Sequence, residues 1–400
     1  MAEASLKLGT DWAVKEDYLL GYNDENGNYK PIPFDFSRAS IGTRVNRDGL
    51  IEVVQDNIPR IDFSSGEGSL LLEPQRTNSL LQSNQFDTTW VNTNSTETGG
   101  QSGVGGSNDA WLLSKSGLNG RLDQTISASG VLTFSIYAKA NALNWIYIRI
   151  DGSGGNHDVY FDLVNGVAGI NNLLIDSDIQ SVGNGYYRCS MSFNDTISVV
   201  RIYPADADGN TSGTSGSIYI QNAQLEAGSY STSLIPTSGS AVTRVAEGCV
   251  SNEDASLFND SEGTLFLEIK GISNGGSSRR FSITSGNVNN RVSLELDETA
   301  SLVKAFMSSN GTLTGTLEVS NITQTDTHKI ALTYTSSAFK IFIDGILEDT
   351  DTSIVGSPIG LDTLQFTSSN DTLPMEGFVK QAFVFKTALT DSECIALTTL

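Results

Sequence analysis

The chain has 400 residues, of which 38% are hydrophobic, a low fraction for a tightly packed enzyme. It carries 24 lysines and arginines against 46 aspartates and glutamates, so its formal net charge is −22. A surface this acidic repels phosphate backbones and anionic lipids, which argues against nucleic acids and membrane surfaces as partners. The many Gly, Ser, Thr and Asn residues between β-branched and aromatic runs predict all-β sandwiches with many turns.

The first 33 residues show little hydrophobic periodicity and end in the turn-rich run NDENGNYKPIP. We expect an N-terminal attachment arm at residues 1–33, ordered by docking to another molecule. The start lacks a basic segment followed by an apolar core, so no secretory signal is expected, and no apolar run is long enough to span a membrane. The cysteines are Cys189, Cys249 and Cys394, and their spacing matches neither a disulfide framework nor a metal site. We expect them to be buried thiols of a protein that folds in a reducing cytoplasm.

Residues 34–78 are predicted to form a short β-rich module. Asp48-Gly49 lies between two strand-like runs, which indicates a hairpin. Arginines punctuate the module, among them Arg38, Arg44, Arg60 and Arg76. We expect them to pair with local carboxylates such as Asp35, Asp62 and Glu73, and the alternative is that some of them hold a partner subunit.

Alternating polar and apolar runs dominate residues 79–247, which are predicted to form the first sandwich domain. The run NTNSTETGGQSGVGGSND is expected to be a long exposed connection, and LIPTSGSAVTRVAEG is expected to be a linker to the next domain. A second β-domain follows at residues 248–400. Asp344-Gly345 predicts a hairpin turn there, and Thr390 with Glu393 has the spacing of a capping box at the start of a short C-terminal helix.

One strand-like run, WIYIRI, separates two kinds of side chain. Ile146, Ile148 and Ile150 fall on one face, whereas Trp145, Tyr147 and Arg149 fall on the other. Sugars lay their C–H faces on aromatic rings and take hydrogen bonds from Arg, Asp and Asn, so this second face predicts a glycan site. Neighbouring runs repeat the pattern, and the candidate glycan-binding residues are Trp145, Tyr147, Arg149, Asp158, Tyr160, Tyr186, Arg188, Arg201 and Tyr203, with Asp162 on the face of Asp158.

The same face has a second interpretation, because Tyr and Arg are also favoured at protein interfaces. In that interpretation, the sheet is covered by the N-terminal module or by a second subunit. A chain that binds sugar needs these side chains gathered into one open patch, whereas an interface needs them covered.

Several ordered motifs in residues 34–247 carry a family resemblance. The run FDFSRASIGTRVNRDGLIEVVQDNIPRIDF followed by SLLLEPQRTNSLLQSNQFDTTW resembles the opening of a family of bacteriophage virion proteins that includes tail fibres, head fibres and other adhesin-like components. TFSIYAKA, VYFDLVNG, NGYYRCSMSF and IYIQNAQLEAGSYSTSLIPTSGSAVTR are similar to the jelly-roll carbohydrate-binding module that follows this opening. Residues 255–400, with FIDG and LTDSE, resemble the concanavalin A-like (laminin-G-like) lectin sandwich.

Catalytic and metal signals are sparse. Glu295 and Asp297 share a strand face but lack the three-carboxylate spacing of lectin-fold glycosidases, so they are interpreted as the wet side of an ordinary strand. The two histidines, His157 and His328, are interpreted as surface residues, His328 at the start of a strand. Asp206, Asp208 and Asn210 in DADGN are candidates for a structural calcium site, although the run lacks the bidentate glutamate of a full calcium loop.

These features favour a structural bacteriophage virion protein, a tail or head fibre or decoration protein that displays glycan-binding modules for host adhesion. The resemblance implies that it folds in the host cytoplasm and is displayed on the outside of the particle. The expected partners are other virion proteins through the N-terminal region, a host-surface glycan, and further copies of the chain in a homotrimer. A purely structural capsid or tail component remains an alternative. A polysaccharide depolymerase is the second alternative, but the carboxylate pattern disfavours it, so we expect no enzyme.

Overall fold

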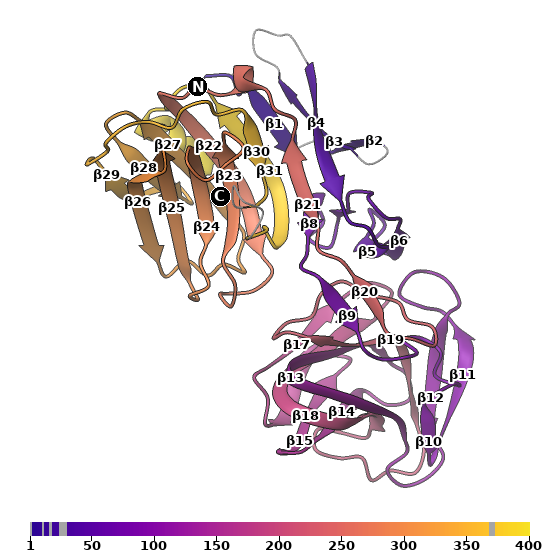
Figure 1. The fold of residues 1–400 in the computed structure, drawn as a ribbon. Helices are drawn as coiled ribbons and strands as arrows, with labels where there is room; N and C mark the ends of the chain where they lie inside the picture. Colours follow the sequence, from indigo (N-terminus) through magenta and orange to yellow (C-terminus); the bar gives the residue numbers. More distant parts are fainter. Residues whose placement is uncertain (1, 10–11, 16–17, 24–29, 368–372) are drawn as a thin grey trace. The chain divides into compact units, whose positions relative to one another are not determined.

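The computed structural model describes residues 2–9, 12–15, 18–23, 30–367 and 373–400, and it is nearly all β (Figure 1). The predicted all-β class is confirmed. The chain divides into two compact units, each assembled from separate stretches: unit 1 comprises residues 1–41, 54–74 and 245–400, and unit 2 comprises residues 42–53 and 75–244. In the described ranges, no helix is long and apolar enough to cross a membrane.

These units cut across the segments expected from the sequence. The expected arm supplies strands of unit 1: β1 (Leu6–Gly9) pairs with β31 (Gly377–Phe385), and β3 (Tyr18–Asn23) pairs with β4 (Lys30–Ser37). The expected module at 34–78 is divided, because residues 42–53 of the hairpin β5 (Gly42–Val45)–β6 (Ile51–Val54) belong to unit 2. Short strands need backbone partners, and here those partners lie far along the chain.

Unit 1 is a sandwich of two antiparallel layers. The first layer runs in the order β30 (Thr363–Gln365), β23 (Arg279–Thr284), β24 (Arg291–Leu296), β25 (Leu302–Ser309) and β26 (Thr312–Ser320). The second runs in the order β29 (Ile346–Asp351), β28 (Phe339–Ile343), β27 (His328–Thr335), β22 (Glu262–Gly271) and β31. From β30, the pairing continues through β21 (Gly248–Ser251), β4, β3 and β1 to β31, so the N-terminal strands join the two layers at one edge. The remaining strands are β2 (Ala13–Lys15), which pairs with β3, and β7 (Ile61–Asp62) and β8 (Ser69–Leu72), where β8 also pairs with β31.

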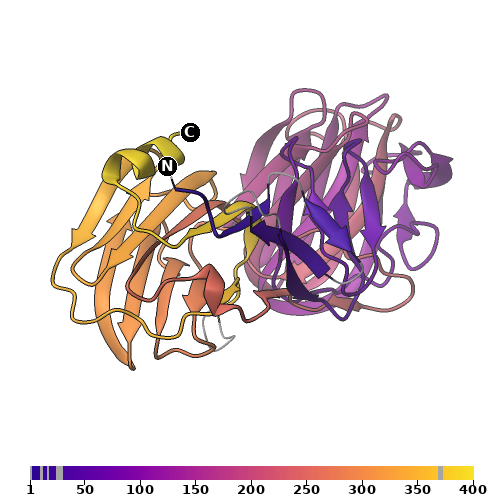
Figure 2. The same ribbon diagram turned by 90° about the horizontal axis from the view of Figure 1, so that it is seen from above.

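The C-terminal helix α1 (Asp391–Thr398) lies beside the second layer (Figure 2). It begins with the predicted capping box, in which Thr390 and Glu393 satisfy each other's backbone N–H groups. Its Cys394 packs against Phe266 on the outer side of the layer. All three cysteines are free and buried, as predicted. The short 3₁₀ helix η2 (Ala255–Leu257) precedes β22.

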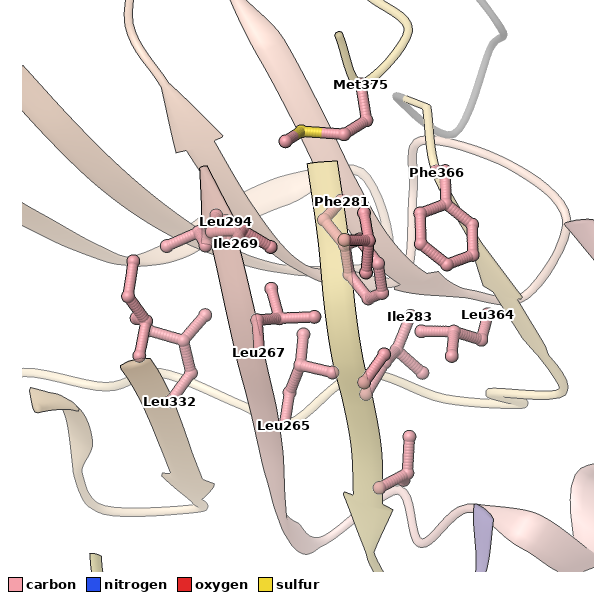
Figure 3. Close-up of a cluster of buried hydrophobic side chains, with 14 of the residues drawn as sticks. Leu265, Leu267, Ile269, Phe281, Ile283, Leu294, Leu332, Leu364, Phe366 and Met375 are labelled. Carbon is pink, nitrogen blue, oxygen red and sulfur yellow. The ribbon is translucent and has the colours of Figure 1, made fainter. Parts of the chain in front are cut away.

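The core of unit 1 lies between its two layers (Figure 3). Leu265, Leu267 and Ile269 of β22 pack with Phe281 and Ile283 of β23, and all five are at most 3% exposed. Hairpin turns organise the strands as predicted. Asp344-Gly345 joins β28 to β29 with positive φ angles of 50° and 84°, which is the backbone of a type I′ turn.

Unit 2 is a second sandwich, made by one continuous sheet that bends into two layers. The long strands β13 (Arg121–Ala140) and β18 (Tyr187–Ala205) contribute to both, and their pairing is irregular between Thr125 and Ala128. The front layer contains the first half of β13 and the second half of β18, with β10 (Val91–Thr93), β14 (Trp145–Gly152), β15 (Gly155–Asp162) and β16 (Val167–Asn172). The back layer contains the other halves with β11 (Ser95–Gln101), β12 (Ala110–Lys115), β19 (Ser217–Ala227) and β17 (Asp176–Ser181).

The alternation predicted for WIYIRI is confirmed, because Ile146, Ile148 and Ile150 are fully buried between the layers. Two segments expected to be loose are instead packed on unit 2. The Gly/Ser/Thr-rich run supplies β10 and the edge strand β11. In the expected linker, Leu234 and Ile235 are buried, and β20 (Val242–Arg244) pairs with β9 (Arg76–Asn78). Their buried apolar side chains and strand pairing outweigh the flexible composition.

Candidate functional site

Most of the predicted glycan-binding residues lie together on the outer face of the front layer. Tyr147 in β14 pairs with Tyr160 in β15 and with Tyr203 in β18, so the three tyrosines form a row across neighbouring strands. The next row along the strands contains Asp158, Arg149 and Arg201. We call this surface the front face, and it comprises Trp145, Tyr147, Arg149, Asp158, Tyr160, Asp162, Arg201 and Tyr203.

Tyr186 and Arg188 do not belong to the front face, and the prediction that they join it was wrong. Tyr186 is fully buried beside the back layer, where its hydroxyl donates to the Ser102 carbonyl oxygen at 2.8 Å. Arg188 lies over the ring of Tyr137 and donates to the Thr232 carbonyl oxygen at 2.5 Å. The cause is the bend in β18: side-chain alternation gives the face of a sheet, whereas the bend sends the two ends of one strand to different layers.

The tyrosines of the front face pack on one another. The ring of Tyr147 stacks on that of Tyr160 with centroids 4.2 Å apart, and Tyr203 lies 5.1 Å away on the neighbouring strand. Burial raises the pKa of both the Tyr147 and the Tyr160 hydroxyl. Since the ring faces of Tyr147 are occupied on both sides, the tyrosines form a fixed wall. Among the described residues, Trp145 has no such ring contact, so its indole is the aromatic surface left for a ligand.

The charged side chains of the front face are held in place by carboxylates. Asp151 accepts from Arg149 Nε at 2.8 Å and from Arg201 Nη2 at 2.6 Å. The Arg149 side chain is still 31% exposed, so its remaining guanidinium hydrogens reach solvent. Burial raises the pKa of Asp158, and the nearby Arg149 and Tyr147 oppose that shift. The result is a partly open array of oriented donors and acceptors beside one free indole.

The oxygens proposed for calcium are engaged by donors of the protein. Asp206 Oδ2 accepts from Lys115 Nζ at 2.8 Å and from the Gly213 N–H at 2.7 Å. Asp208 accepts from the Ile170 N–H at 2.8 Å, and Asn210 Oδ1 accepts from the Ser212 N–H at 2.9 Å. Across the described ranges, no group of three or more His, Cys, Asp or Glu side chains is placed to hold a metal ion.

The carboxylates at the end of β24 are buried rather than solvated, so their interpretation as the wet side of a strand was wrong. Glu295 and Asp297 are each 4% exposed. Glu295 bonds to Arg280 and Ser278, and Asp297 forms an ion pair with Lys304 at 2.8 Å. Despite burial, the hydrogen bonds from Lys304 and Thr299 lower the pKa of Asp297 to about 2. Cations on neighbouring strands therefore compensate these charges.

His157 was also interpreted wrongly as a surface residue, since it is only 5% exposed. Its Nε2 lies 2.9 Å from Asp195 Oδ2, its Nδ1 lies 2.7 Å from the Leu173 carbonyl oxygen, and its ring stacks on Phe193. His328 begins β27, as predicted, and is half-buried 2.7 Å from Asp344 Oδ2. Both imidazole rings therefore form hydrogen bonds that connect loops to strands.

Asp195→Asn is expected to destabilise unit 2 at neutral pH, and to do so less as the pH falls. Hydrogen bonds from His157, Ser153 and the Gly154 N–H hold the pKa of Asp195 below its ordinary value. A depressed carboxyl pKa contributes stability above the unfolded-state pKa, about 3.9, and that contribution is lost as the pH falls through the folded-state pKa. Thermal unfolding between about pH 7 and pH 2 measures this convergence. The exposed Asp87→Asn is the control, and parallel curves for Asp195→Asn and the wild type contradict the prediction.

A pocket that the sequence did not reveal lies elsewhere on unit 2. It has a volume of about 510 Å³. Four separate segments build its wall: the hairpin β5–β6, residues 83–85, residues 100–111, and residues 221–237. Thr43 Oγ1 of the hairpin donates to the Leu234 carbonyl oxygen at 2.8 Å and so fixes two of these segments to each other. We call it the hairpin pocket, and its residues include Ile51, Glu52, Asn84, Val104, Asp109, Trp111, Asn222, Leu234, Pro236 and Thr237.

No protein-family model matches the chain, and no curated protein is similar to it. Several solved structures are similar to a little over a third of the chain. The CBM40 of the Ruminococcus gnavus IT-sialidase, bound to alpha2,3 sialyllactose, is 21% identical over 36% of this chain and 86% of that chain, with a TM-score of 0.31. Domain 4 of AbnA, a GH43 extracellular arabinanase from Geobacillus stearothermophilus in complex with arabinotriose, is 15% identical over 38% and 73%, with a TM-score of 0.31.

The binding domain of botulinum neurotoxin serotype D is 11% identical over 38% of this chain and 40% of that chain, with a TM-score of 0.30. Nothing about the fold, activity or ligand of this chain follows from likenesses at these identities and TM-scores. The chemistry of the front face and of the hairpin pocket rests on the contacts within this chain.

Proposed function

We propose that this chain is a glycan-binding structural protein of a bacteriophage virion, displayed on the outside of the particle as part of a fibre or decoration. The front face of unit 2 contacts a glycan of the host surface. The observation that carries the proposal is the free indole of Trp145 beside the fixed array of Arg149, Asp158 and Arg201. A sugar ring lies flat on an indole while its hydroxyls bond to planar charged groups at the edge.

The virion context is supported by the motifs in residues 34–247 that resemble phage fibre proteins. The acidic surface suits dense display on a particle, because like charges keep neighbouring copies soluble. Repetition in a homotrimer and over a virion turns weak single-site binding into useful avidity. Other virion proteins are the proposed partners of the N-terminal region, and no enzymatic activity is part of this proposal.

The purely structural alternative is favoured by one observation. The rings of Tyr147, Tyr160 and Tyr203 pack on one another and need no ligand to cover them, as is typical of a scaffold surface or a covered interface. In that case the front face binds no sugar, and its substitution changes stability or assembly instead.

Trp145→Ala is expected to weaken glycan binding about tenfold, because it removes the half-buried indole that, among the described aromatic side chains of the front face, is not stacked on another ring. The measurement is binding of the purified chain to an array of neutral, sialylated and bacterial surface glycans, with thermal unfolding as the check on folding. Val131→Ala, which trims an exposed side chain on the back-layer half of β13, is the matched control. Undiminished binding by a folded Trp145→Ala variant, or no binding by the wild type, would favour the structural alternative.

A further inference from the structure

The hairpin pocket has a buried polar wall residue whose side-chain amide makes no hydrogen bond in the described part of the chain. Asn222 is 9% exposed and lines the pocket. Leaving a buried amide unpaired is costly, so this side chain indicates a ligand or water that completes it.

A second indication is the conformation of Asn222. This residue has a φ of 53°, although it is not glycine, and it lies where the pairing of β13 with β19 is irregular. Its N–H donates to Asn84 Oδ1 at 3.1 Å, while its side-chain amide makes no hydrogen bond among the described residues. Asn adopts this left-handed conformation readily, and the bulge it allows re-aims the neighbouring side chains, as bulges beside binding sites do.

The charge of the wall restricts the ligand. None of the residues that line the pocket in the described structure is Lys, Arg or His, whereas Glu52 and Asp109 are both present. Arg44 Nε holds Glu52 at 2.7 Å, but the Asp109 carboxylate makes no hydrogen bond in the described part of the chain. An acceptor-rich wall repels anions and suits a neutral molecule that offers several hydroxyl donors.

The remaining wall is apolar and aromatic. Ile51, Val104, Leu234 and Pro236 line the pocket with Trp111. The Trp111 indole is fixed, because its Nε1 donates to the Asn84 carbonyl oxygen at 2.8 Å and its ring meets Phe86 edge-on. The pocket volume is within the range of small-molecule sites, roughly 300–1,000 Å³. The apolar wall therefore suits the C–H groups of a ligand, and the acceptor-rich wall suits its hydroxyls.

We propose that the hairpin pocket is a second binding site, separate from the front face, and that it takes one neutral pyranose unit. Asp109 and Asn222 bond to its hydroxyls, and Trp111 with the apolar wall receives its C–H face. The site does not depend on the proposed function of the front face, since the two share no residue.

Saturation-transfer NMR on the full chain tests this site with glucose, galactose, mannose and N-acetylglucosamine at millimolar concentrations, and with N-acetylneuraminic acid as the anionic comparison. At least one neutral sugar is expected to bind, and the anion is expected to bind more weakly. Asp109→Asn keeps the shape and removes the carboxylate charge, so affinity is expected to fall about three- to tenfold. Asn222→Gly keeps the positive φ, removes the amide, and is expected to weaken binding similarly.

Two results separate the sites. Trp145→Ala is expected to leave neutral monosaccharide binding in the hairpin pocket unchanged, and Asp109→Asn is expected to leave binding to the glycan array by the front face unchanged. The proposal is overturned if no neutral sugar binds, if the anion binds better, or if binding survives both Asp109→Asn and Asn222→Gly in folded variants. Loss of sugar binding with Trp145→Ala alone would assign the signal to the front face and overturn the pocket.

Discussion

Replacing Glu247 with alanine is expected to lower the free energy of unfolding of unit 1 by about 3–5 kcal/mol, because it leaves buried cations without their carboxylate. Glu247 Oε1 lies 2.7 Å from both Arg38 Nη1 and Arg60 Nε, and its Oε2 bonds to Arg60 and to the Glu73 N–H. All four side chains of this network are at most 4% exposed.

The network is balanced in charge, since two arginines face two glutamates. Arg60 Nη1 also pairs with Glu73 at 2.8 Å. Burial alone would lower the pKa of Arg60, but the attraction of Glu247 and Glu73 outweighs it and raises the pKa. Removing one carboxylate therefore leaves an excess positive charge in a site that water does not reach, which is far costlier than breaking an ion pair at the surface.

Calorimetry measures the expected loss as a lower unfolding temperature of one transition, because the two units need not unfold together. Hydrogen exchange then locates it, with faster exchange expected in residues 54–62 and 70–74 and little change in unit 2. Glu253→Ala is the matched control, since Glu253 is exposed in the same unit, and its effect is expected to stay within about 0.5 kcal/mol. Equal effects of the two substitutions would show that the network contributes no more than a surface residue.

The sequence allowed half of this network to be predicted. The arginines of the short module were expected to pair with local carboxylates, Glu73 among them, and Arg60 forms such a pair with Glu73. Glu247 was missed because it is 187 residues away from Arg60, and local patterns do not indicate which distant segments meet. The Arg44–Glu52 pair at 2.7 Å joins two strands of one hairpin and was within reach of the same local reasoning.

The candidate site shows the same boundary between local and distant information. The period of two placed Trp145, Tyr147 and Arg149 on one face correctly, because alternation is a property of a single strand. The alternation could not show that β18 bends between layers, so Arg188 was assigned to the wrong surface. The hairpin pocket could not be predicted from alternation at all, since four segments far apart in sequence form its wall. The glycine-rich run before Trp111 was the available signal, and it was interpreted as a loose connection.

Replacing Asn78 with leucine is expected to destabilise unit 2 by about 2–4 kcal/mol, because one fully buried amide serves four backbone groups. Its Nδ2 donates to the carbonyl oxygens of Ala223 at 3.3 Å and Ile235 at 2.9 Å. Its Oδ1 accepts from the N–H groups of Leu80 and Leu225, each at 3.1 Å. Leucine fills a similar volume, so the loss comes from these unpaired groups rather than from a cavity.

The Asn78 amide joins β19 to residues 234–237, and both ends of this wall segment line the hairpin pocket. Asn78→Leu is therefore expected to increase hydrogen exchange most in residues 221–237, in addition to lowering the unfolding temperature of unit 2. Asn171→Leu makes the same chemical change at an exposed position and is expected to alter stability by less than about 0.5 kcal/mol. If Asn78→Leu unfolds at the wild-type temperature, the backbone groups around Asn78 find other partners, and the pocket wall is not held by this side chain.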